Sequence, residues 1–146
     1  MATIDRGATP SEGLTSVDMY VPAPEPSTPH IDYEIIAKMP VWDSNGIMIP
    51  LDHLYRNQKV IIVFIRNFLC YTAKEYVEDL AKIPPNYLWD ANVRLVVIGC
   101  SEWKYIKAFK NETGFPYELY VDQEKNIFSA LKLKNHSSVQ GKTYAV

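Results

Sequence analysis

The sequence predicts an α/β fold built on a parallel sheet, and two observations carry this prediction. Two predominantly apolar runs, residues 60–65 and 93–99, have the length and β-branched composition of strands buried on both faces. Between them, residues 71–82 carry apolar side chains at helical spacing, and Pro84 ends that pattern. A strand, a helix and a second strand in this order predict a right-handed βαβ unit with parallel strands.

The residues before this unit predict a tail and then a β-hairpin. Residues 1–32 hold half of the ten prolines and show no apolar period, so we expect a disordered tail followed by one domain over residues 33–146. Residues 40–49 predict a hairpin, because Asn45-Gly46 readily takes the positive φ angles of a tight turn. Residues 51–55 predict a single helical turn.

The residues after the unit predict three further elements. Ser101 is expected to cap a helix that ends at Gly114, residues 118–121 to form a short strand, and Asp122 to cap a helix over about residues 124–133. The last four residues, Thr143 to Val146, resemble the opening of a strand, so we expect an incomplete domain.

Composition excludes several classes of function. The net charge is −2 with acidic and basic residues intermixed, so nothing predicts nucleic-acid binding. Neither an apolar run of membrane-spanning length nor a signal peptide is present, and we therefore expect no membrane partner and a cytoplasmic location. The sequence has no glycine-rich phosphate loop, and its three histidines lie far from its two cysteines in sequence. We therefore expect no cofactor and no metal.

Cys70 is the candidate reactive residue, because it lies between a predicted strand and a predicted helix. The first turn of a helix has unpaired N–H groups and a partial positive charge, which favour a thiolate over a thiol. Arg66, at the end of the strand, would add a positive charge. The alternative is that Cys70 is a small buried apolar residue. Cys100 follows the second strand at the same sheet edge, where it is either a partner thiol or a packing residue.

The blocks VFIRNFLCYTAKEYVEDLAKIP and GFPYELYVDQEKNIFSALKL resemble the peroxiredoxin-like 2 family, a selenoprotein U-related group of the AhpC/TSA superfamily, and especially its 2C branch. The resemblance covers about residues 33–133. It implies a thioredoxin-like fold with a peroxiredoxin-type N-terminal hairpin and a βαβ core, in which Cys70 is the redox-active residue. It also implies that the C-terminal strands and helix of that fold are missing here.

Three positions depart from the family pattern. Ala73 stands where a Cys-x-x-Cys motif has its second thiol, so an oxidised Cys70 would need Cys100, another protein or glutathione to resolve it. Asn67 replaces the threonine of true peroxiredoxins, and Lys142 lies near the position expected for an activating arginine.

The resemblance therefore implies an antioxidant thiol oxidoreductase or weak peroxidase. The Cys70 thiolate would attack a peroxide or a disulfide, assisted by Arg66, Thr72 and the helix amides, with thioredoxin or glutathione as the reducing partner. Cys100 is the candidate resolving cysteine. The alternative is a catalytically impaired thioredoxin-like protein that acts as a regulatory or signalling binding module, which Ala73 and Asn67 favour.

Overall fold

The structure is a computed structural model that describes residues 21–24 and 28–133. Residues 21–24 and 28–30 contain no helix or strand. Most of the expected tail lies outside the described residues, as do Lys142 and the expected strand at 143–146. The division into a tail and one domain therefore stays a prediction.

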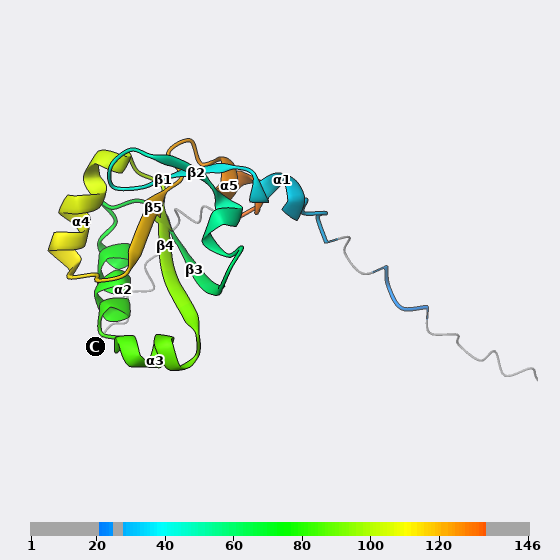
Figure 1. The fold of residues 1–146 in the computed structure, drawn as a ribbon. Coiled ribbons are helices and arrows are strands. Elements are labelled where there is room, and N and C mark those ends of the chain that lie inside the picture. The colour runs from blue at the N-terminus through cyan, green and yellow to red at the C-terminus, as the bar shows by residue number, and fades with distance from the viewer. Residues whose placement is uncertain (1–20, 25–27, 134–146) are drawn as a thin grey trace, which may run out of the picture. The chain divides into compact units, whose positions relative to one another are not determined.

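From Ile31 onward, the described residues form an α/β fold around a five-stranded sheet (Figure 1). The strand order is β2-β1-β5-β4-β3. The strands are β1 (Pro40–Trp42), β2 (Met48–Pro50), β3 (Lys59–Ile65), β4 (Val93–Gly99) and β5 (Glu118–Val121). Strands β3, β4 and β5 are parallel, whereas β1 pairs antiparallel with β2 and β5. The predicted hairpin and parallel strand–helix–strand unit are both confirmed.

Helices cover both faces of the sheet. Helices α2, α3 and α4 pack on one face, and α1, the 3₁₀ turn η1 and α5 pack on the other (Figure 1). The helical elements are α1 (Tyr33–Ala37), η1 (Leu51–Leu54), α2 (Tyr71–Ala81), α3 (Pro85–Asp90), η2 (Trp103–Tyr105), α4 (Ile106–Thr113) and α5 (Asn126–Ala130). The sequence did not predict α3, because Pro84-Pro85 was interpreted only as a stop. Proline is equally suited to the first position of a helix, which Pro85 occupies.

The central strand β4 supplies the core on both faces. Its side chains alternate, with Leu95 and Val97 in the cluster under α2 and α4, and Val96 and Ile98 in the cluster under η1 and α5. All four side chains are buried. This burial makes β4 the rigid element from which the residues after Gly99 extend.

The prediction that the run at residues 60–65 is buried on both faces is wrong. It forms β3, as expected, but β3 lies at the edge of the sheet and pairs only with β4 among the described residues. Ile61 is consequently 51% exposed, and within β3 only Ile65 is buried. An apolar run indicates a strand but does not distinguish a central from an edge position.

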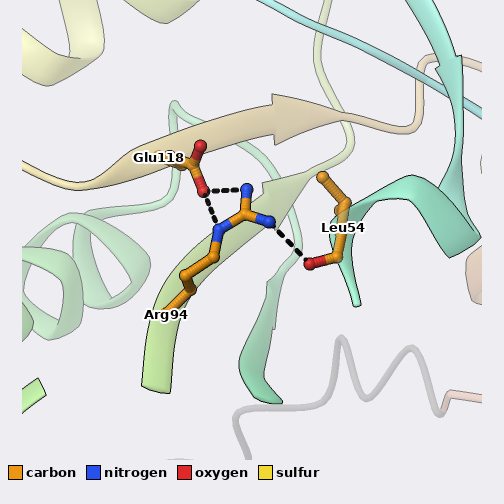
Figure 2. Close-up of polar contacts among 3 residues, drawn as sticks. All are labelled: Leu54, Arg94 and Glu118. Carbon is orange, nitrogen blue, oxygen red and sulfur yellow. Dashed lines mark hydrogen bonds and ion pairs between the residues drawn. The ribbon is translucent and has the colours of Figure 1, made fainter. Parts of the chain in front are cut away.

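Arg94 joins three elements at the start of β4. Its Nε and Nη2 atoms donate to Glu118 Oε2 on β5, at 3.0 and 2.5 Å, and its Nη1 atom donates to the Leu54 carbonyl of η1 at 2.8 Å (Figure 2). The guanidinium is less than one-third exposed, since its side chain has a relative accessibility of 29%. The planar guanidinium is hydrogen-bonded to β5 through Glu118 and to η1 through the Leu54 carbonyl. It therefore fixes η1 against the start of β4 and β5.

Replacing Arg94 with Met should therefore lower the free energy of unfolding by about 1–2 kcal/mol, because several charge-assisted hydrogen bonds are lost. Urea denaturation measures this. The matched control is Arg56→Met, which removes the exposed Arg56–Asp52 pair and should cost less than about 0.5 kcal/mol. Equal losses of unfolding free energy in the two variants would contradict the role of Arg94 in joining η1, β4 and β5.

Candidate active site

Cys70 is the N-cap residue of α2. Its backbone is extended, with φ −78° and ψ 117°, and its carbonyl accepts the first helical hydrogen bond from Lys74 at 3.0 Å. The thiol is half-buried. Leu69 and Tyr71, on either side, are 97% and 71% exposed. Cys70 therefore lies at the accessible surface and is not the fully buried residue of the alternative interpretation.

The surroundings of Cys70 favour its thiolate. The Thr72 hydroxyl lies 3.1 Å from Sγ, and this contact is the largest influence lowering the pKa of Cys70. The Ala73 and Thr72 backbone N–H groups and the charge of Arg66 also lower this pKa, against the opposing effect of burial. Contributions from the helix terminus, Arg66 and Thr72 were all expected, without an order among them. The structure places the Thr72 hydroxyl first and Arg66 last among the favourable influences.

The segment between β3 and α2 is fastened to the end of β4. Cys100 N–H donates to the Arg66 carbonyl at 3.0 Å, and Phe68 N–H donates to Ser101 Oγ at 3.2 Å. Asn67 Oδ1 accepts the Leu69 N–H at 3.0 Å, which closes the turn locally. We call residues 66–70 the Cys70 loop.

Ser101 does not cap the following helix, contrary to the sequence analysis. The first element there is η2, whose N-cap is Glu102 and which has no side-chain capping bond. The Ser101 hydroxyl points to the Cys70 loop instead. The only sequence signal for the contact with the Cys70 loop is the position of Ser101 directly after a buried strand. A serine at that position could equally cap the following helix.

Phe68 is the apolar anchor of the Cys70 loop. Its ring is 9% exposed and stacks on Phe109 of α4, with centroids 4.3 Å apart and planes at 15°. Gly99 makes room for this ring, because a Cβ atom there would lie 2.7 Å from a Phe68 ring carbon. Gly99 therefore contributes to the site by leaving space for Phe68. The sequence pattern did not predict this contribution.

Cys100 is a buried free thiol. Burial, followed by the nearby Asp122 carboxylate, raises the pKa of Cys100 to about 11, with Lys125 acting in the opposite direction. Asp122 is itself 1% exposed and caps α5 as predicted, accepting N–H groups at 2.9–3.1 Å from Asn126, Ile127 and Phe128. Both cysteines are free thiols in this structure.

A cavity of about 630 Å³ lies beside the Cys70 loop. It is lined by residues 67–69, residues 100–102, Gln123 and one side of α4. Lys74, one turn into α2, pairs at 2.5 Å with Glu112 in the cavity wall. The cavity therefore adjoins the first turn of α2, although Cys70 does not line it.

The described residues contain no group of three or more His, Cys, Asp or Glu side chains that could hold a metal ion. His30 and His53 are exposed, and His136 lies outside the described residues. Within residues 21–24 and 28–133, no helix has the length and apolarity needed to cross a membrane.

Two solved structures illustrate the similarity of this fold to those of known proteins. The bacterioferritin comigratory protein of Xanthomonas campestris matches with a TM-score of 0.61 and 16% identity, over 74% of this chain and 69% of that one. Prx3 of Vibrio vulnificus, solved in its reduced form with hydrogen peroxide, matches with a TM-score of 0.62 and 14% identity, over 71% of this chain and 68% of that one. These matches and the five-stranded sheet with helices on both faces show a thioredoxin-like fold.

Sequence comparison gives the family. Residues 74–143 match the model of the AhpC/TSA antioxidant enzyme family. Human peroxiredoxin-like 2C is 43% identical over 119 residues, which are 80% of this chain and 53% of the human protein. The chain belongs to this peroxiredoxin-like family of AhpC/TSA proteins, as its sequence blocks predicted.

The matches cover part of this chain and part of each relative. The chain spans about half the length of the curated relatives it matches. The match to the family model begins at Lys74, so Cys70 lies outside it. Arg66 and Thr72 also lie outside the match, whereas Cys100 lies inside it.

Replacing Thr72 with Ala should raise the pKa of Cys70 and slow its alkylation at neutral pH several-fold, because the sulfur loses its hydroxyl contact. Alanine is the better helix former, so loss of α2 would not explain the change. The rate of iodoacetamide labelling against pH measures the effect. Thr72→Ser keeps a hydroxyl and should retain the parent profile, and identical profiles for the Ala and Ser variants would refute the role of Thr72.

Proposed function

We propose that this protein is a thiol oxidoreductase whose Cys70 thiolate attacks a disulfide or a peroxide. The observation that carries the proposal is the accessible Cys70 thiol at the start of α2, 3.1 Å from the Thr72 hydroxyl and with a lowered pKa. A thiolate at such a position is the form that reacts with both substrate classes. Membership of a family described as antioxidant enzymes supports the same chemistry.

The two reactions begin with the same atom. With a disulfide, Cys70 Sγ attacks one sulfur, a mixed disulfide forms, and the other sulfur leaves as a thiolate. With a peroxide, Sγ attacks one oxygen, the O–O bond breaks, Cys70 becomes a sulfenic acid, and the other oxygen leaves as an alkoxide or hydroxide that takes up a proton. Two equivalents of an external thiol then return the sulfenic acid to the thiol, releasing water and a disulfide.

Three groups assist Cys70 in this proposal. The Thr72 hydroxyl donates to the thiolate, and the N–H groups of Thr72 and Ala73 stabilise its charge. Arg66, exposed at the start of the loop, contributes a positive charge to the same region. The arrangement requires neither a metal nor an organic cofactor.

An external thiol, such as glutathione or a thioredoxin-type protein, resolves the oxidised Cys70. Ala73 provides no sulfur on the first turn of α2, and its side chain packs against the core. Cys100 is a weak candidate for this step, because a pKa of about 11 keeps it neutral at physiological pH and a neutral thiol is a poor nucleophile.

The direct test compares the parent chain with Cys70→Ser. In the parent, iodoacetamide should label Cys70 with a midpoint below the free-thiol value of about 8.5, and brief peroxide exposure should add one oxygen detected by intact mass. Neither change should occur at the serine variant. A midpoint at or above the free-thiol value, with no oxidation, would refute the proposal and leave the regulatory binding role as the function to pursue.

A second experiment tests the resolving step. Because Cys100 is buried and neutral, peroxide followed by glutathione should give a glutathione adduct on Cys70 in equal yield in the parent and in Cys100→Ser. Peptide mapping by mass spectrometry locates the adduct. An intramolecular Cys70–Cys100 disulfide in the parent would show that Cys100 is the resolving cysteine after all.

A further inference from the structure

The Ser101 hydroxyl forms the polar link between the end of β4 and the middle of the Cys70 loop. It accepts the Phe68 N–H at 3.2 Å, across 33 positions of sequence. We propose that Ser101 is a positioning residue for Cys70, which it holds at the start of α2 through Phe68. The proposal deepens the function proposed above, on which it rests.

The Phe68 N–H needs this acceptor. The Phe68 residue is 9% exposed, and its ring is enclosed by Phe109 and Gly99, so a change in its backbone direction would pull the ring from its pocket. A buried N–H without a partner is unfavourable, and the loop would shift to find one. Ser101 therefore selects one backbone conformation for the loop.

That conformation determines where the sulfur lies. Phe68 is two residues before Cys70, and Cys70 N–H closes the turn onto the Asn67 carbonyl at 3.4 Å. At the other end, the Cys70 carbonyl accepts from Lys74 and begins the helix. Only with both ends fixed does Sγ face the Thr72 hydroxyl and the first amides of α2.

Ser101 is suited to this task because its own backbone is well supported. It directly follows Cys100, whose N–H donates to the Arg66 carbonyl and whose side chain is buried. Two successive residues after β4 thus hold two positions of the loop, Arg66 and Phe68. Ser101 also borders the 630 Å³ cavity.

The test uses Ser101→Ala, which removes the acceptor, and Ser101→Thr, which keeps it. Ser129→Ala, at an exposed position on α5, is the matched control. Two quantities are measured in each folded protein: the rate of Cys70 alkylation against pH, and hydrogen exchange of the Phe68 amide by NMR. The second quantity is independent of any redox activity.

We expect Ser101→Ala to alkylate several-fold more slowly at pH 7, with its midpoint moved to higher pH, and its Phe68 amide to exchange at least about tenfold faster. The threonine variant and the Ser129 control should match the parent in both quantities. An alanine variant that loses stability but keeps the parent alkylation profile would show that Ser101 only stabilises the fold, which would overturn the proposal.

The unmodified protein gives a test that needs no variant. The Phe68 amide should be protected relative to an unstructured peptide, and exchange at the unprotected rate would overturn the proposal. Failure of the proposed function is a separate result. It would appear as an unreactive Cys70 in the parent, whereas failure of the positioning role would appear as a reactive Cys70 that is indifferent to Ser101→Ala.

Discussion

The parallel pairing of β3 with β4 is the constraint on which the site depends. Ile65 lies opposite Gly99 in this register, so both strands end at the same level and their following residues leave the same edge of the sheet. The Arg66 carbonyl can then meet the Cys100 N–H, and the turn that leads to Cys70 lies directly beside β4. A shift of the register by one residue would reverse the faces of β3 and remove this junction.

The stabilisation of the Cys70 thiolate comes mainly from neutral dipoles. The Thr72 hydroxyl and two backbone N–H groups outweigh the charge of Arg66, which is exposed to solvent. Dipoles in direct contact with the sulfur are weakened little by dissolved salt, whereas an exposed charge at greater distance is screened. The reactivity of Cys70 therefore depends on the local backbone conformation, which places these groups around the sulfur. The Cys70 loop fixes that conformation and is part of the site.

Much of the fold could be predicted from the sequence, because apolar runs and turn residues report local structure. The runs at 60–65 and 93–99, Gly114 as the end of α4 and Asp122 as the cap of α5 all act within a few residues of their own positions. Contacts between distant segments left no such signal. Lys74 of α2, for example, pairs with Glu112 on α4, 38 positions away in sequence.

The candidate site, like the fold, could be predicted from the sequence only where it depends on neighbouring residues. The place of Cys70 at the start of a helix follows from the order of strand and helix, and Thr72 lies within one turn of it. The partner of Ser101 could not be predicted, because its hydroxyl had an equally good local use as a helix cap. The edge position of β3 could not be predicted either, because it depends on the order of the strands in the sheet.

The contact between Phe68 and Gly99 links two distant positions in what substitutions they tolerate. The Phe68 ring occupies the space that any side chain at position 99 would need, so a larger residue at 99 is acceptable only with a smaller one at 68. Substitutions at two residues in contact have coupled effects on stability. Descendants of this sequence are therefore expected to retain glycine and phenylalanine as a pair, or to exchange both and rebuild the loop around a different anchor.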